Sequence, residues 1–273
     1  MSDSEEVLTR TAEAPDLSLQ YGDGPYHVLD VRLPAAASGA ALVVVVHGGF
    51  WRSRYDRSHT YPQCDGLVAA GYVAATVEYR RVGGRGGGWP GTFDDIASVT
   101  DSVVSLVADA VGPRVDQQRV VLVGHSAGAH LARWATSRHR LSPDSPWRRA
   151  EPLPVRGVVS LAGVVDLTMA DHRQLGSGAT SALLGGSATE QPERYAAADP
   201  ARLLPTGIRT VLVHGESDDV VPVEISASYA EQARAAGDQA DLHVLEGVGH
   251  FELIDPLSQA WPAVLDAIGT ALS

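Results

Sequence analysis

Residues 120–130 read VVLVGHSAGAH. A β-branched apolar run stops at Gly-His-Ser-Ala-Gly, and an alanine-rich stretch with helical periodicity follows at once. The pattern G-x-S-x-G between a strand and a helix is typical of a sharp turn that exposes a serine hydroxyl. Gly124 and Gly128 leave room for this turn, which makes Ser126 the candidate nucleophile. The amide of Ala127, at the start of the helix, is placed to donate to an oxyanion.

Composition indicates a globular enzyme-sized chain. The 273 residues are 44% hydrophobic and 20% charged, with a net charge of −12. This length predicts one large domain, which we place at residues 21–273, and residues 1–20 are expected to be a mobile or loosely docked lead-in. The acidic charge disfavours nucleic acid and anionic membranes as partners, and leaves a small molecule as the expected one. The polar start predicts no signal peptide, and a single cysteine, Cys64, allows no intrachain disulfide, so we expect a cytoplasmic protein.

Hydrophobic patterning predicts strands that alternate with helices. The unbroken valine run of residues 41–47 is typical of a strand buried on both faces. Alternation over residues 26–33, ended by Pro34, predicts an edge strand. Residues 141–154 should form a surface loop, and residues 167–206 a small cap. Further strands are expected at 72–79, 119–123, 155–161, 208–214 and 241–246, and helices at 61–70, 92–111, 127–137, 223–236 and 257–272. This order predicts an α/β fold with a mostly parallel sheet and helices on both faces.

A serine nucleophile needs a base, and the base needs an orienting carboxylate. His250 lies in the glycine-rich loop 247–251, just after the last predicted strand. Loops at the carboxyl ends of parallel strands converge on one crevice, so we expect His250 and Ser126 to meet there. The loop after the preceding strand, HGESDDVVP, offers Glu216, Asp218 and Asp219 as the carboxylate.

The loop after the early valine strand is the expected second half of an oxyanion hole. It reads His-Gly-Gly-Phe-Trp over residues 47–51. Glycines let the backbone approach a substrate closely, and the free amides of Gly49 and Phe50 would point at a developing negative charge.

These motifs resemble the α/β-hydrolase fold superfamily over about residues 26–272. The order serine, acid, histidine is that of the superfamily's catalytic triad. In the related motif H-G-x-x-D-x-x-V-P the fifth residue is the catalytic acid, which implies Asp218 here. Some members of the fold place the acid after an earlier strand, which makes Asp166 a rival; otherwise Asp166 would cap the turn that follows it. The motif H-G-G-x-W is similar to that of the kynurenine formamidase group and related esterases, whereas Phe50 departs from the H-G-G-G of the hormone-sensitive-lipase group.

The expected activity is acyl transfer to water by Ser126, His250 and Asp218, with a carboxylic ester as substrate. An aryl formamide is the alternative that the resemblance suggests, and a ligand-binding receptor on the same fold is another. The substrate pocket is expected to be apolar or aromatic. Its predicted lining residues are Trp51, Trp89, Leu183 and Leu184.

No cofactor or metal is expected. Residues 86–91 match G-x-G-x-x-G, but Arg80–Arg85 separate them from the preceding strand and Pro90 interrupts them. A dinucleotide site needs these glycines directly between a strand and a helix. The chain also lacks a zinc-binding His/Cys pattern.

Overall fold

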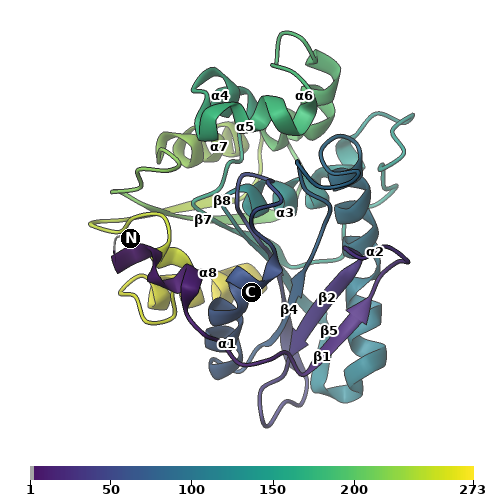
Figure 1. Cartoon of the computed structure of the whole chain (residues 1–273), viewed down its shortest axis with the longest axis vertical. Coiled ribbons are helices and arrows are strands. Elements are labelled where there is room, and N and C mark those ends of the chain that lie inside the picture. Colours follow the sequence, from purple (N-terminus) through teal and green to yellow (C-terminus); the bar gives the residue numbers. More distant parts are fainter. Residues whose placement is uncertain (1–2) are drawn as a thin grey trace.

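A computed structural model describes residues 3–273 of the chain. Its centre is an eight-stranded sheet in the order β1-β2-β4-β3-β5-β6-β7-β8 (Figure 1). β4, β3 and the strands from β5 to β8 are parallel to one another, whereas β1 and β2 are antiparallel to their neighbours. The strands are β1 Leu17–Gln20, β2 Val28–Arg32, β3 Ala40–Val46, β4 Val73–Val77, β5 Val115–His125, β6 Gly157–Leu161, β7 Arg209–Gly215 and β8 Ala240–Leu245.

Helices cover both faces of this sheet. α1 and α8 pack on one face, and α2, α3 and α7 pack on the other. The main helices are α1 Tyr61–Ala69, α2 Gly91–Val111, α3 Ala127–Ser137, α7 Glu224–Ala235 and α8 Trp261–Leu272. Short 3₁₀ helices span Asp3–Thr9, Arg57–Thr60, Gly112–Arg114, Arg138–Arg140, Pro200–Leu203 and Glu252–Ile254. The predicted α/β architecture is confirmed: the chain has the α/β-hydrolase fold.

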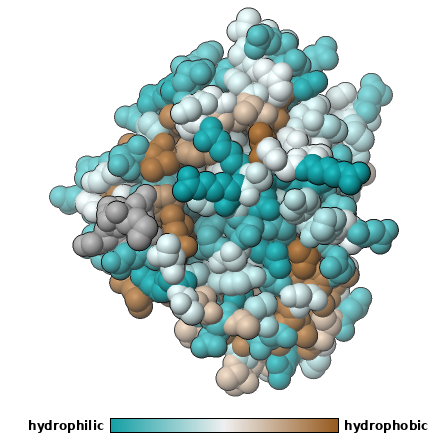
Figure 2. All heavy atoms as spheres, in the orientation of Figure 1, coloured by the Kyte–Doolittle hydropathy of each residue, from teal (hydrophilic) through white to brown (hydrophobic). Residues whose placement is uncertain are grey.

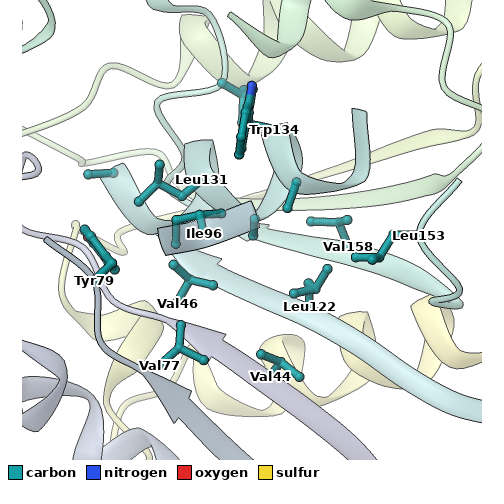
Figure 3. Packing of buried hydrophobic residues seen from close by; sticks show 14 of the residues in the cluster. Val44, Val46, Val77, Tyr79, Ile96, Leu122, Leu131, Trp134, Leu153 and Val158 are labelled. Atoms are coloured by element: carbon teal, nitrogen blue, oxygen red, sulfur yellow. The ribbon is translucent and has the colours of Figure 1, made fainter. Parts of the chain in front are cut away.

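The valine-rich strands supply the core, because their side chains alternate between the two faces. In β3, Val43 and Val45 belong to the layer under α1 and α8. Val44 and Val46 belong to the opposite layer, together with Ile96 of α2 (Figure 3). A strand that buries both faces must be apolar at every position, which explains why the valine run has no polar interruption.

The N-terminal segment is docked more closely than the sequence predicts. Residues 17–20 form β1 and pair with β2, so the sheet includes part of the expected lead-in. The expected edge position of residues 26–33 is wrong, because β2 lies between β1 and β4. Val7 is buried, and Arg10 Nη2 lies 2.9 Å from Asp255 Oδ2. The expected lead-in includes two residues, 1 and 2, that lie outside the described part. Residues 17–20 alternate only weakly in hydrophobicity, and four residues are too few to predict a strand. Backbone groups make the hydrogen bonds to β2, so the pairing is not visible in the side chains.

A helical segment between β6 and β7 covers the carboxyl edge of the sheet, at the top of Figure 1. It contains α4 Leu167–His172, α5 Leu175–Leu184 and α6 Pro192–Ala198. Within α5 the backbone of Gly176, Ser177 and Gly178 is left-handed, with φ of 57°, 55° and 73°. Arg52, from the loop after β3, donates a hydrogen bond to the carbonyl of Gly176. The segment is therefore fastened to the loop that is the candidate oxyanion hole.

Residues 91–114 are long and apolar enough to cross a membrane by length and composition alone. In the fold this helix is α2 with its C-terminal turn, and Phe93, Ile96 and Val99 are wholly buried against the sheet. Figure 2 shows a face on which hydrophilic residues predominate and hydrophobic residues form small, separate groups. The apolar side of α2 is thus explained by packing in the core.

Candidate active site

Ser126 lies on a strained corner between β5 and α3. Its φ and ψ are 55° and −120°, a conformation that residues with a Cβ rarely adopt. A Cβ atom at Gly124 would lie 2.4 Å from the carbonyl oxygen of Gly128, and one at Gly128 would lie 2.0 Å from that of Val46. Both positions of the G-x-S-x-G motif therefore require glycine, because the start of α3 lies against the end of β5 at Gly124 and against the end of β3 at Gly128.

The loop after β3 lies directly against Ser126. A Cβ atom at Gly48 would lie 3.2 Å from the Cβ of Ser126, and Gly49 and Phe50 have φ of 104° and 50°. Within residues 3–273, the amides of Gly49, Phe50 and Ala127 donate to no protein acceptor. Amides held open beside a serine are preorganised donors for an oxyanion.

Asp218 and His250 form a close buried pair at the same edge of the sheet. The Nδ1 of His250 lies 2.7 Å from Oδ2 of Asp218, whose other oxygen accepts the amides of Val220 (2.9 Å) and Val221 (2.8 Å). Burial by itself raises the pKa of Asp218, but hydrogen bonds from His214, His250 and the Val221 amide lower it well below its usual range. Asp218 is thus held as a carboxylate.

This pair sets the tautomer of the imidazole. A carboxylate only accepts hydrogen bonds, so the proton of neutral His250 lies on Nδ1. The Nε2 atom is then unprotonated and available to take a proton. Orientation of a base by a buried carboxylate is the arrangement on which serine hydrolysis depends.

The structure separates Asp218 from its rivals. Glu216 and Asp219 are exposed. Asp166 caps α4 by accepting the amide of Met169 at 2.8 Å, which is the structural role that the sequence offered as its alternative. Of the four carboxylates considered from the sequence, Asp218 is the one bonded to His250.

Two histidines that support the site were not recognised from the sequence. His214 Nε2 lies 2.8 Å from the carbonyl of Val221 and 3.3 Å from Oδ2 of Asp218. His125 Nε2 lies 3.0 Å from the carbonyl of His250. His214 opens the same H-G-x-x-D motif as Asp218, a signal that would have identified it. His125 carries no such signal beyond its place beside Ser126.

A family model, BD-FAE, matches residues 29–232 of the chain. The chain belongs to the BD-FAE family. This BD-FAE family member is 27% identical over 235 residues to Esterase LipQ of Mycobacterium tuberculosis, with 84% of this chain and 55% of LipQ covered. It is 28% identical over 273 residues to isoprenylcysteine alpha-carbonyl methylesterase ICME of Arabidopsis thaliana, with 92% and 60% covered. The chain therefore spans between 55% and 60% of the length of these two relatives.

Solved structures share the fold of this BD-FAE family member. A truncated carbohydrate esterase from gut microbiota matches with a TM-score of 0.78 at 20% identity, covering 95% of this chain and 99% of the other. Esterase 2 of Thermogutta terrifontis with bound propionate matches with a TM-score of 0.69 at 23% identity, covering 93% and 91%. These structures agree in fold, and the match to the BD-FAE family confirms the superfamily predicted from the motifs; the formamidase subgroup is not among the relatives named here.

Three residues predicted to line the substrate pocket of this BD-FAE family member are core residues instead. Trp51, Leu183 and Leu184 are 0% exposed, so this prediction is wrong for them. The indole nitrogen of Trp51 donates to His130 Nδ1 at 3.2 Å, behind the oxyanion loop. Trp89 is partly exposed, and the centroid of its ring lies 4.8 Å from that of Trp147. Apolar residues near a catalytic motif can line a pocket, but they can equally be buried. Leu183 and Leu184 belong to α5, which packs these side chains into the core.

A buried polar cluster of His47, Glu78 and Arg81 lies at the start of the oxyanion loop in this BD-FAE family member. His47 Nε2 lies 3.2 Å from Oε1 of Glu78, and that oxygen lies 3.3 Å from Nη1 of Arg81. The neighbouring Arg80 binds Asp95, with Nη2 2.6 Å from Oδ1. Burial raises the pKa of Glu78, but the hydrogen bond from His47 and the charge of Arg81 lower it below its usual value. The base of the loop is therefore held by the contact between His47 and Glu78 and by the ion pair between Glu78 and Arg81.

Proposed function

We propose that this BD-FAE family member hydrolyses carboxylic esters through an acyl-enzyme on Ser126. The observation that carries the proposal is the Asp218–His250 pair, whose side chains are buried and which leaves Nε2 of His250 free to act as a base at the edge of the sheet where Ser126 lies. Relatives named as esterases support the reaction class.

The chemistry runs in two halves. Ser126 Oγ attacks the ester carbonyl carbon while His250 Nε2 takes the hydroxyl proton, and Asp218 stabilises the imidazolium that forms. The amides of Gly49, Phe50 and Ala127 donate to the tetrahedral oxyanion. The alcohol leaves with the proton of His250. Water then attacks the acyl-enzyme with His250 as the base again, which releases the carboxylic acid and restores Ser126.

The substrate that we propose is an ester of a small apolar or aromatic molecule. The ring of Phe50, partly exposed beside an oxyanion amide, provides an apolar wall close to the reacting carbonyl. Solved structures of Thermogutta terrifontis esterase 2 hold propionate or butyrate, which are small acyl products of this kind. The buried positions of Trp51, Leu183 and Leu184 leave less apolar surface for an acyl chain than the sequence suggested.

The motif H-G-G-x-W suggests an aryl formamide as a second substrate class. Trp51, the last residue of the motif, is buried and bonded to His130, so the tryptophan is explained by packing without reference to a formamide. The ester is therefore favoured.

Steady-state hydrolysis of p-nitrophenyl acetate, p-nitrophenyl butyrate and N-formylkynurenine tests this proposal. We expect ester cleavage that falls by on the order of 10⁴-fold or more in Ser126→Ala, since loss of the nucleophile removes the covalent route. Preference for the formamide would replace the ester proposal. A single turnover followed by arrest would indicate a ligand receptor, and equal turnover by the variant would overturn the mechanism.

A further inference from the structure

His125 connects the nucleophile corner to the loop that carries the base. It is the last residue of β5 and directly precedes Ser126. Its Nε2 atom lies 3.0 Å from the carbonyl oxygen of His250, and the two rings are 4.4 Å apart between centroids. A carbonyl only accepts a hydrogen bond, so His125 donates and carries its proton on Nε2.

The loop around His250 has limited support of its own. Glycines stand at 247 and 249, and Gly247 has a φ of 68°. The neighbouring carbonyl of Val248 accepts the amide of Ser217 at 2.9 Å. Among the residues that the structure describes, His125 is the sole donor to the carbonyl of His250. Asp218 therefore orients the imidazole ring, while His125 holds the main chain from which that ring projects.

We propose that His125 is a positioning residue that sets the placement of His250 relative to Ser126. This inference rests on the proposed function, because positioning matters only if the two residues react together. The bond reaches from the residue before the nucleophile to the base itself. If the His250 loop moved, this hydrogen bond would break or the turn at Ser126 would move with the loop. An error of about 1 Å in such a geometry costs as much as about 10²-fold in rate.

The charge state of His125 suits this role. Burial, followed by the proximity of His250 and His59, lowers the pKa of His125 well below its usual value, although Asp218 acts in the opposite direction. His125 is therefore neutral at working pH. During turnover His250 becomes an imidazolium, and a neutral neighbour adds no like-charge repulsion to that step.

Two substitutions separate the donor from the rest of the side chain. In His125→Gln the amide nitrogen takes the place of Nε2, whereas in His125→Asn it takes that of Nδ1 and is too short to reach the carbonyl of His250. We expect His125→Asn to lower kcat for p-nitrophenyl butyrate by roughly 10–100-fold with little change in KM. We expect His125→Gln to recover most of that loss. Thermal unfolding of both variants establishes that they fold.

An activity-independent measurement accompanies the kinetics. In ¹⁵N-labelled protein, long-range proton–nitrogen spectra report the tautomer of each histidine and the Nδ1 proton of His250. We expect an Nε2-protonated His125 in the unsubstituted protein, and a His250 Nδ1 proton signal that survives in His125→Gln and broadens or shifts in His125→Asn.

The outcomes distinguish the two proposals. Absence of Ser126-dependent hydrolysis with the expected spectra would overturn the proposed function and leave the bond itself supported. An Nδ1-protonated His125 would overturn the positioning role without any variant. Wild-type kcat and an unchanged His250 signal in folded His125→Asn would overturn it as well.

Discussion

Asp218 and His250 lie 32 residues apart in the chain and meet at 2.7 Å. They follow β7 and β8, which are adjacent and parallel, with His214 opposite Val244 and Gly215 opposite Leu245. Both strands end at the same edge, so the loops that follow them must run side by side. The strand pairing therefore brings the acid and the base together, and the loop residues only complete the contact.

Removal of the charge on Asp218 should disable the base. In Asp218→Asn, the amide would favour the wrong tautomer of His250, and we expect kcat for p-nitrophenyl butyrate to fall by on the order of 10³–10⁴-fold. Asp219→Asn is the matched control, because this neighbour is exposed and, within the described residues, forms no hydrogen bond with His250 or Ser126. Equal losses in the two variants would contradict the assignment of Asp218.

The helical segment over the site should influence the oxyanion loop through Gly176. A Cβ atom at Gly176 would lie 2.7 Å from the ring of Phe50, so Gly176→Ala should displace that ring and its amide. We expect kcat/KM to fall by roughly 10-fold or more, as for other small displacements of an active-site group. Gly178 has a similar left-handed backbone, with φ of 73°, but a Cβ atom there would come no closer than 3.5 Å to Gln174.

Gly178→Ala is therefore the control for backbone strain without contact to Phe50. It should cost about 1 kcal/mol of stability, the usual cost of a left-handed alanine, and leave kcat/KM near that of the unsubstituted protein. Parallel measurements of kcat/KM and urea unfolding separate the two effects. A loss of kcat/KM as large in Gly178→Ala as in Gly176→Ala would show that strain alone is responsible.

The glycine after the nucleophile should be essential for stability as well as for activity. In Gly128→Ala the new methyl group would lie 2.0 Å from the carbonyl of Val46, and relief requires α3 to move from β3. We expect a loss of about 1–3 kcal/mol or more in the free energy of unfolding. Gly269→Ala, at an exposed position of α8 with open space around the new atom, should instead stabilise by about 0.5–1 kcal/mol. Opposite signs in urea unfolding are the expected result; equal signs would refute this account of the corner.

Asp199 should make stability depend on pH. Its wholly buried carboxylate accepts the amides of Leu167 and Thr168, both at 3.0 Å, and Arg202 Nε lies 3.9 Å from Oδ2. Burial, and then the charge of Asp166, raises the pKa of Asp199 to about 6. The folded protein thus holds this proton more tightly than the unfolded chain, in which an aspartate titrates near about 3.9.

The sign of the effect follows from that difference. The contribution of Asp199 to stability is fully present below about pH 4 and is lost as pH rises to about 6, by ~3 kcal/mol in total. Asp199→Asn should remove this component. Urea unfolding of both proteins between about pH 4 and pH 7 measures it, and identical pH slopes would contradict the raised pKa.

The periodic elements and the motif residues could be predicted from the sequence. The valine run of β3, the helix of residues 127–137 and the order Ser126, Asp218, His250 all depend on local patterns. The pairing of residues 17–20 could not be predicted, because their backbone bonds to β2 leave no trace in four side chains. The prediction of the pocket residues was wrong for a related reason. The sequence shows that a side chain is apolar, but it does not distinguish a side chain that lines a cleft from one that is buried in the core.

By itself, the sequence determined that a strand turns sharply into a helix at Ser126, because G-x-S-x-G stands between an apolar β-branched run and a stretch with helical periodicity. It also determined which strands are buried on both faces, since burial demands apolar side chains along their whole length. Only the tertiary structure excluded the rivals of Asp218 as partners of His250, and only it showed that His125 contacts the base loop and that Gly176 lies against the ring of Phe50. These contacts join residues distant in sequence, and their geometry depends on strand order and on helix placement. Side-chain periodicity records the face that a residue buries, but it does not record the partner that the residue meets there.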